Sequence, residues 1–139
     1  MDDNNYQILS QLRESVISKM RTFVDKDNER FFPDSELLQL SEIEVSFLSR
    51  NSISRHGLTT NLDKSKKLTS SNCAVRLNRK LFEAKYLEYA KFVLFHEYIH
   101  CLGNFSHDKN FRQLENLWPE KKQMNIIGRQ LTRDLQEVK

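Results

Sequence analysis

The amino-acid sequence predicts an α+β fold: an N-terminal helix, a small three-stranded, mainly antiparallel sheet, a helix with a metal-binding motif and two C-terminal helices. Two observations support this prediction. Apolar residues recur every three or four positions towards both ends of the chain, and three short stretches between residues 43 and 77 have strand-like patterns. Strands grouped ahead of helices are typical of an antiparallel sheet packed on helices. At 139 residues, the chain is expected to form one domain, residues 1–139.

The first predicted helix runs from about Tyr6 to Asp25. Its apolar residues recur at helical spacing on one side, with charged residues on the other; the apolar set is Leu9, Leu12, Val16, Met20 and Phe23. Further along, Asp34 or Ser35 is expected to cap a short helical turn. That turn carries Leu37 and Leu38.

Three strand candidates follow. In the first, Ile43, Val45 and Phe47 point one way and the polar residues between them point the other. Residues 53–60 form a weaker candidate that contains His56 and Gly57. The third candidate covers Cys73 to Leu77, and the polar, lysine-bearing residues 61–71 before it are expected to be a loop or hairpin connection.

Three helices are expected in the rest of the chain. A strongly apolar helical run over residues 86–95 leads into the metal-binding motif, and a second helix covers Asp108 to Trp118. Pro119 separates it from a final helix, Glu120 to about Glu137. The apolar face of this final helix consists of Met124, Ile127, Leu131 and Leu135.

Composition narrows the class of protein. Charged residues make up 29% of the chain, mean hydropathy is −0.66, and no apolar run is long enough to span a bilayer, so no membrane association is expected. The acidic, polar N-terminus is unlike a secretory signal, and a cytoplasmic (intracellular) location is expected. Two cysteines, Cys73 and Cys101, do not make a disulfide framework. A net charge of +3 is compatible with weak DNA association and does not require it.

The segment His96-Glu97-Tyr98-Ile99-His100 matches the zinc-hydrolase pattern H-E-x-x-H. Residues four apart share one face of a helix, so His96 and His100 can bind the same metal ion. Glu97 directly follows the first of these ligands and can take a proton from a metal-bound water. Two histidines do not complete a catalytic zinc site, which usually has three protein ligands and one open position.

His107 is the best candidate for the third ligand. Gly103 is suited to end the motif helix in a left-handed conformation, after which the chain can fold back and bring His107 to the metal. Asp108 and Glu115 are the alternatives. Glu115 lies eight residues after His107, about two turns along a following helix. Either His107 or Glu115 would therefore coordinate the metal, and not both.

Three segments resemble a known group of enzymes; they read Val75-Arg76-Leu77-Asn78-Arg79-Lys80-Leu81, Val93-Leu94-Phe95-His96-Glu97-Tyr98-Ile99-His100 and His107-Asp108-Lys109-Asn110-Phe111. They are similar to the SprT-like and YgjP-like zinc metallopeptidases and to the minimal peptidase domain called a minigluzincin. The resemblance covers residues 70–118. It implies one Zn²⁺ held by His96, His100 and His107, with Glu97 as the general base for hydrolysis of polypeptides.

The sequence departs from these families at three points. Asp108 stands where SprT-like proteins often have glycine, and residues 70–73 read Ser-Ser-Asn-Cys where YgjP-like proteins often have Gly-Ser-Cys-Ser. True gluzincins use a glutamate as third ligand, which keeps Glu115 open as an alternative. No separate DNA-binding module of the kind found in eukaryotic SprT-like proteases is visible, so DNA-associated protein degradation is a weaker expectation.

The leading hypothesis is therefore a zinc endopeptidase. In such peptidases, the strand corresponding to Cys73–Leu77 is an edge strand that pairs with an extended substrate, which makes Ser71, Asn72 and Ala74 candidate substrate-binding residues. His56 and Arg76 are candidates for stabilising the oxyanion.

Two other hypotheses remain. The first is a zinc-dependent hydrolase of a non-peptide bond, since fold and metal do not fix the substrate. The second is a non-enzymatic module that binds peptide or nucleic acid, and its basic surface would consist of Lys64, Lys66, Lys67, Lys121, Lys122, Arg129 and Arg133. Glu97 argues against the second, because a purely structural zinc site has four protein ligands and needs no base.

Overall fold

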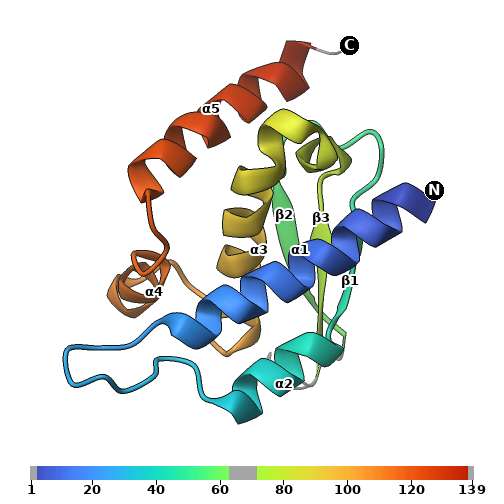
Figure 1. The fold of residues 1–139 in the computed structure, drawn as a ribbon. Helices are drawn as coiled ribbons and strands as arrows, with labels where there is room; N and C mark the ends of the chain where they lie inside the picture. The colour runs from blue at the N-terminus through green and yellow to red at the C-terminus, as the bar shows by residue number, and fades with distance from the viewer. Residues whose placement is uncertain (1–2, 63–71, 138–139) are drawn as a thin grey trace.

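In the computed structural model, which describes residues 3–62 and 72–137, five α-helices pack together with a three-stranded sheet (Figure 1). Helix α3 (Leu87–Cys101) lies at the centre, with the sheet along one side, and α1 (Asp3–Thr22) crosses in front of both. This arrangement confirms the predicted α+β class. None of the described helices is long and apolar enough to cross a membrane.

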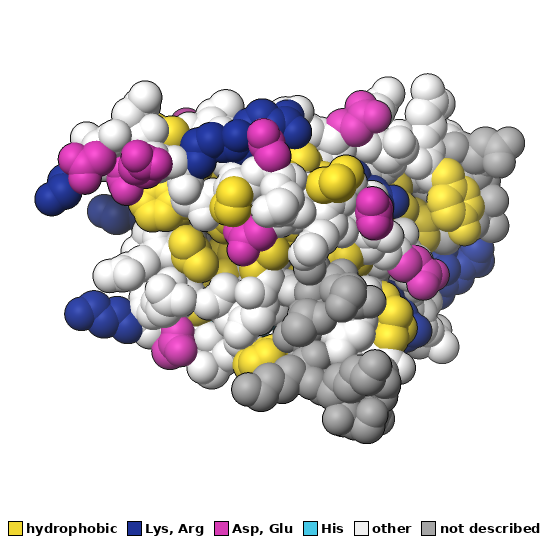
Figure 2. Space-filling view, turned by 90° about the horizontal axis from the view of Figure 1, so that it is seen from below, with side chains coloured by type: hydrophobic (Ala, Val, Ile, Leu, Met, Phe, Trp, Pro, Cys, Tyr) yellow, Lys and Arg dark blue, Asp and Glu magenta, His cyan; other side chains and the backbone are white. Residues whose placement is uncertain are grey.

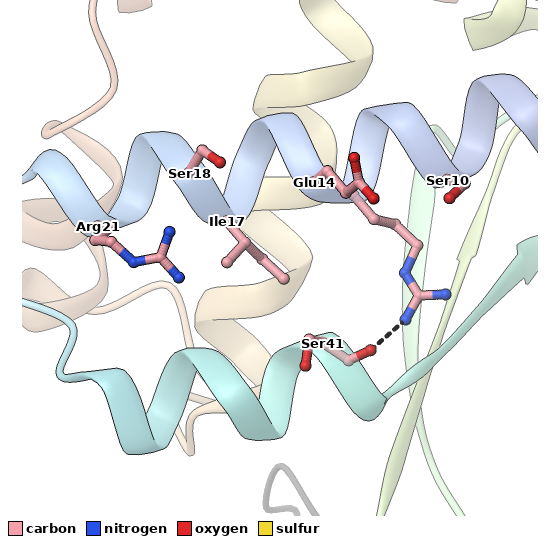
Figure 3. Close-up of a pocket in the computed structure, with 7 residues that line it drawn as sticks. Ser10, Glu14, Ile17, Ser18, Arg21 and Ser41 are labelled. Carbon is pink, nitrogen blue, oxygen red and sulfur yellow. Dashed lines mark hydrogen bonds between the residues drawn. The ribbon is translucent and has the colours of Figure 1, made fainter.

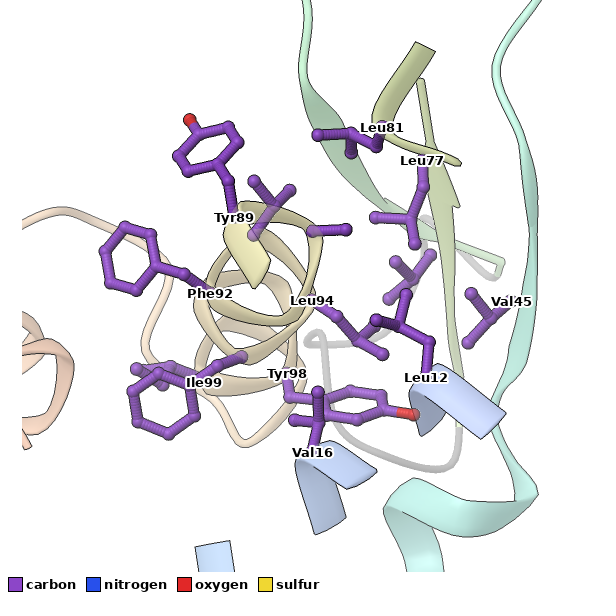
Figure 4. Packing of buried hydrophobic residues seen from close by; sticks show 14 of the residues in the cluster. Leu12, Val16, Val45, Leu77, Leu81, Tyr89, Phe92, Leu94, Tyr98 and Ile99 are labelled. Atoms are coloured by element: carbon purple, nitrogen blue, oxygen red, sulfur yellow. The ribbon is translucent and has the colours of Figure 1, made fainter. Parts of the chain in front are cut away.

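The apolar stripe of α1 supplies one wall of the core. Leu9, Leu12, Val16 and Met20 are buried, as the helical spacing predicted. Figure 4 shows Leu12 and Val16 packed beside Leu94 and Tyr98 of α3. The helix ends at Thr22, three residues before the predicted end, and the Thr22 hydroxyl donates to the Lys19 carbonyl in its last turn. The stripe therefore fixes α1 against the motif helix.

Helix α2 (Asp34–Glu42) begins differently from the sequence prediction. Its N-cap is Pro33 and no side chain caps it, so neither Asp34 nor Ser35 serves as the cap. Asp34 already belongs to the first helical turn, where its carboxylate binds Arg30 at 2.8 Å. Leu37 and Leu40 point inward and are buried, whereas Leu38 is 63% exposed.

The C-terminal end of α2 is tied to α1 by a single arginine. The Arg13 guanidinium donates to the carbonyls of Ser41 and Ile43, both at 2.8 Å, and the first of these bonds is drawn in Figure 3. These carbonyls lack partners inside the helix, so the arginine replaces the missing backbone donors.

The sheet consists of β1 (Glu44–Phe47), β2 (Gly57–Asn61) and β3 (Cys73–Leu77) in the order β1-β3-β2. β3 pairs parallel to β1 and antiparallel to β2, so the sheet is mixed and not mainly antiparallel as predicted. Residues 48–56 reverse the chain and place β2 two strand spacings from β1, about 10 Å away. β3 fills that gap, and its direction then matches β1.

Only one face of the sheet is covered by α3. Cys73, Val75 and Leu77 are buried on this face, whereas Arg76 lies exposed on the other. The β2–β3 register places Gly57 and Thr59 opposite Leu77 and Val75, and therefore on the α3 side. The buried free thiol of Cys101 lies at the last residue of α3.

The C-terminal part follows the predicted order of helices. Two short 3-10 turns (Arg79–Phe82 and Ala84–Tyr86) precede α3; α4 covers Lys109–Glu115 and α5 covers Lys121–Glu137. Helix α4 ends before Trp118, the predicted end. On α5, Met124, Leu131 and Leu135 are buried, and Gly128 is needed because a Cβ there would lie 2.7 Å from the Tyr89 hydroxyl.

Candidate metal centre

The histidines of the motif are brought together by the end of α3 and by the chain that follows it. His96 and His100 lie one turn apart on α3. Gly103 then adopts φ 101°, and its N–H donates to the His100 carbonyl at 3.0 Å. This is the left-handed helix end that the sequence predicted, a conformation that glycine adopts without a steric penalty. The chain reverses there and brings His107 back towards the helix.

The three imidazoles form one cluster. One nitrogen from each of His96, His100 and His107 lies within 4.8 Å of the others, and the His100 and His107 Nε2 atoms are 3.1 Å apart. Two nitrogens bound at 2.0–2.1 Å to a tetrahedral zinc would be about 3.3 Å apart. The three histidines could therefore bind one metal ion. The buried Phe111 ring supports the cluster from α4, with its centroid 4.7–4.8 Å from each imidazole.

Hydrogen bonds fix which nitrogen of each α3 histidine is available. His96 Nδ1 lies 2.6 Å from Glu115 Oε2, and His100 Nδ1 lies 2.8 Å from the Asn104 carbonyl oxygen. An ionised carboxylate and a carbonyl can only accept, so both Nδ1 atoms must donate. The lone pair is then left on Nε2. Burial also lowers the pKa of His100 and of His107, which favours the neutral imidazole that a metal requires.

Glu115, the alternative third ligand, lies behind His96 and outside the cluster. Its side chain is 2% exposed, and Oε1 accepts from Arg112 and Lys121, each at 2.8 Å, while Oε2 accepts from His96. Burial acts to raise the pKa of Glu115, but the bonds from His96, Lys121 and Arg112 outweigh it and hold the pKa at about 2. An ionised carboxylate in this position orients the imidazole of His96.

Asp108, the other alternative, caps α4. Its carboxylate accepts from the Phe111 N–H at 2.9 Å and from the Ser106 hydroxyl at 3.3 Å. Asp108 is not part of the histidine cluster. Its role at the helix N-terminus explains why aspartate follows His107 directly.

Glu97 lies beside the cluster, between α3 and β2. Its side chain is 6% exposed, and Oε1 accepts from the Thr59 hydroxyl at 2.8 Å. Burial raises the pKa of Glu97, against the opposing influence of His96, Thr59 and Arg55. Gly57 makes room for this carboxylate, because a Cβ at that position would lie 3.0 Å from Oε2 and 2.8 Å from a Val93 methyl.

The cluster opens into a pocket of about 270 Å³. The three histidines and Glu97 line it together with residues 57–59 of β2, Arg55 and Phe105. The larger groove between α1 and α2, about 480 Å³, contains no residue of the motif (Figure 3). Arg55, Thr59 and Phe105 were not singled out from the sequence, since no local pattern marks a residue that reaches the motif only through folding.

The two residues proposed to stabilise an oxyanion do not line this pocket. The His56 ring lies between α3 and α5, with Nδ1 2.7 Å from the Tyr89 hydroxyl and Nε2 2.9 Å from the Thr132 hydroxyl. Burial lowers the pKa of His56. Arg76 is exposed on the face of β3 that turns away from α3. Alternation along β3 turns Arg76 away from the pocket, whereas His56 precedes β2 and is held by Tyr89 and Thr132.

The prediction that the strand Cys73–Leu77 is an edge strand is wrong. β3 lies in the middle of the sheet, and Ala74 is buried between Glu44 on one side and Thr60 on the other. Asn72 precedes β3, and its carbonyl accepts from the Leu62 N–H at 2.7 Å; Ser71 lies outside the described residues. The edge strand next to the pocket is β2, because the chain inserts β3 between the two earlier strands.

The basic surface suggested by the sequence is only partly described. Lys64, Lys66 and Lys67 lie outside the described residues, and Lys121 is engaged with Glu115. On the face shown in Figure 2, acidic and basic side chains are intermixed. The described residues on that face form no extended area of positive charge of the kind that DNA would favour.

Comparisons with known proteins found no match: no family model fits the chain, and no curated protein or solved structure was found to be similar. The likeness to zinc metallopeptidases therefore depends on the motifs alone. The structural finding is a cluster of three histidines, two on one helix and one after it, that could bind a metal ion.

Proposed function

We propose that the protein is a zinc metallopeptidase that cleaves peptide bonds within polypeptides. The observation that carries this proposal is the convergence of three imidazole nitrogens beside the buried carboxylate of Glu97, at the floor of one pocket. A structural metal site would need a fourth protein ligand. Among the described residues, no other Cys, His, Asp or Glu belongs to the cluster.

The residues of the cluster fit zinc. Imidazole nitrogen is a preferred zinc ligand, and His96 and His100 are held in the tautomer that leaves Nε2 free. Three such ligands leave the fourth position open. Zinc bound there would supply a water of lowered pKa and polarise the carbonyl of the substrate.

Glu97 would act as the general base. Burial raises the pKa of its carboxyl group, which makes the carboxylate a better proton acceptor than an exposed glutamate. The Thr59 hydroxyl holds Oε1 and so fixes the plane of the group. Glu97 takes the proton of the attacking water and passes it to the leaving amine, so that proton transfers balance over one cycle.

The outer edge of β2 supports a peptide as the substrate. The His56 carbonyl accepts from the Asn78 N–H, and the Leu62 N–H donates to the Asn72 carbonyl. In an antiparallel pair, the backbone N–H and C=O groups of every second residue of β2 therefore point towards β3. The backbone N–H and C=O groups of Gly57 and Thr59 therefore point outward, over the pocket side. An extended peptide can pair with such an edge through its own main chain, whatever its side chains.

The Glu97→Ala variant tests the mechanism. We expect it to bind about one zinc per chain, as the wild type does, and to lose hydrolysis of an unfolded protein such as casein. Glu88→Ala is the matched control, because Glu88 lies on the same helix but is exposed and pairs with Lys91. Zinc content is measured by elemental analysis and cleavage by gel electrophoresis. Unchanged casein cleavage by Glu97→Ala would contradict the mechanism.

The same assay separates the two other hypotheses. Zinc binding without cleavage of any peptide would favour a hydrolase of a different bond, and absence of zinc would favour a binding module. Running it with and without single-stranded DNA tests the weaker expectation of DNA-associated protein degradation. Stimulation that disappears at high salt is the result expected of a DNA cofactor.

A further inference from the structure

One charged group in the pocket has no part in the mechanism above. Arg55 lines the pocket together with His96 and Glu97 and, among the described residues, is the only Lys or Arg that does so. In the described part of the chain, its guanidinium has no hydrogen-bond or ion-pair partner. By contrast, Arg13 binds two carbonyls and Arg112 binds Glu115. The positive charge of Arg55 is therefore available to a bound molecule.

The backbone of Arg55 is held in place. Its carbonyl accepts from Asn78 Nδ2 at 2.8 Å, and the next carbonyl, that of His56, accepts from the Asn78 N–H at 2.9 Å. Asn78 is 4% exposed, so these bonds are shielded from water. The Cα of Arg55 is thereby fixed at the rim, two residues before β2 begins, while the side chain remains exposed.

Arg55 lines the same pocket as the three histidines and the Glu97 carboxylate, so a molecule bound there can reach its guanidinium. A guanidinium presents planar N–H donors that match a carboxylate with two parallel bonds. It has no acceptor and carries its charge at every physiological pH. A free guanidinium at this rim thus selects an anion of carboxylate shape and disfavours a cationic group.

The direction of β2 indicates which part of a bound peptide would lie near Arg55 and carry that anion. β2 runs from Gly57 to Asn61, and Arg55 precedes its first residue. Antiparallel pairing is somewhat more stable per residue than parallel pairing. A peptide added in that direction would run opposite to β2, with its C-terminal part beside Gly57 and therefore towards Arg55.

We propose that Arg55 is a specificity-determining residue that binds a carboxylate of the substrate on the C-terminal side of the scissile bond. The carboxylate is either an Asp or Glu side chain or the free C-terminus of the peptide. This inference rests on the proposed peptidase function. It adds a substrate class to it: peptides with a negative charge after the cut.

Matched peptides test the proposal. The cleavage site is first located by mass spectrometry of casein fragments, and quenched fluorescent peptides are then built around it. One pair has Glu or Gln after the scissile bond, one has Glu or Gln before it, and one has a free or amidated C-terminus. The second pair is the control for position, and the third separates a terminal carboxylate from a side chain.

The wild type is expected to cleave the preferred carboxylate peptide with a kcat/KM about ten- to a hundredfold above its neutral partner, the range of one hydrogen-bonded charge pair. Arg55→Ala should remove this ratio, and Arg55→Lys should retain part of it, because charge remains but the planar fork is lost. Arg50→Ala is the matched control, since Arg50 is exposed and lines a different pocket. Equal ratios in wild type and Arg55→Ala would overturn the proposal.

Binding measurements distinguish failure of this proposal from failure of the peptidase function. Fluorescence anisotropy uses labelled unstructured casein peptides in matched Glu and Gln forms, and with a free or amidated C-terminus, on the zinc-loaded Glu97→Ala protein with and without the Arg55→Ala change; it requires neither hydrolysis nor a known cleavage site. If the wild type cleaves no peptide but Arg55 still determines tighter binding of the carboxylate peptide, the peptidase function fails and the role of Arg55 stands. If the two peptides bind equally, or neither binds, the role of Arg55 is overturned.

Discussion

The two walls of the pocket differ in how the chain builds them. The histidine wall, which consists of His96, His100 and His107 with Glu115 supporting His96 from behind, comes from one continuous segment of α3, its reversal and α4. The strand wall, which consists of Arg55, Gly57 and Thr59, comes from β2 and the residues before it; Thr59 lies 38 residues ahead of Glu97. One wall needs only local folding, and the other needs the sheet to dock on α3.

This difference separates two tasks. The histidine wall orients nitrogen atoms through local bonds, such as those from His96 to Glu115 and from His100 to the Asn104 carbonyl. The strand wall contacts Glu97 and offers a backbone edge, so it influences the proton acceptor and the substrate. We therefore expect changes in the histidine wall to alter metal affinity, and changes in the strand wall to alter turnover and its pH dependence at constant metal affinity.

The largest effect is expected from His107→Ala. Removing one of three ligands takes away on the order of a third of a zinc-binding free energy of roughly 12 kcal/mol, or about a thousandfold in affinity. Isothermal titration with zinc measures this. The metal-free protein should keep its melting temperature, because His107 is exposed. A zinc affinity equal to that of the wild type would show that His107 is not a ligand and that the histidine wall supplies only two metal ligands.

A smaller effect on the same wall is expected from Glu115→Gln. The amide has nearly the shape of the carboxylate but lacks its charge, so the bond that fixes His96 Nδ1 weakens. Loss of such a supporting group typically costs ten- to a hundredfold in metal affinity. The same zinc titration checks this. The loss of zinc affinity must be smaller than in His107→Ala, since the reverse order would make Glu115 the ligand.

Lys121→Ala is the control for Glu115→Gln. Lys121 binds Oε1 of Glu115 and does not touch His96. Both variants disturb the buried charge cluster, but only Glu115→Gln changes the partner of an imidazole. Equal losses of zinc affinity in the two would mean that general destabilisation of α4, and not orientation of His96, is responsible.

The comparison also explains what could be predicted from the sequence. Helical periodicity fixes which residues share a face, so the stripe of α1 and the pairing of His96 with His100 could be inferred directly. Gly103 marked the reversal, because its positive φ is a property of a single residue. The histidine wall could be predicted from the sequence because each feature that forms it depends on residues close together in the chain.

The strand wall could not be predicted in the same way, because it depends on contacts between residues far apart in the chain. The strand pattern predicts Cys73–Leu77 correctly, but periodicity contains no information about strand order and cannot show that β3 lies in the middle of the sheet. The parallel pairing of β1 with β3 follows from how residues 48–56 cross the sheet, which composition does not reveal. The contact between Thr59 and Glu97 exists only once β2 has taken the remaining edge.

The smallest effect, and the most direct test of separate tasks, is expected from Thr59→Val. The hydroxyl of Thr59 donates to Glu97 Oε1 and so stabilises the ionised form; valine keeps the shape and removes the donor. The pKa of Glu97, already raised by burial, should rise further. Since the base must be deprotonated to act, the acid limb of the kcat/KM profile should move to higher pH by about one unit, while zinc affinity stays constant.

Thr60→Val is the control, because Thr60 alternates with Thr59 and faces away from α3. A profile identical to that of Thr60→Val would remove Thr59 from the site, and a loss of zinc affinity as large as that of His107→Ala would show that the two walls act as one.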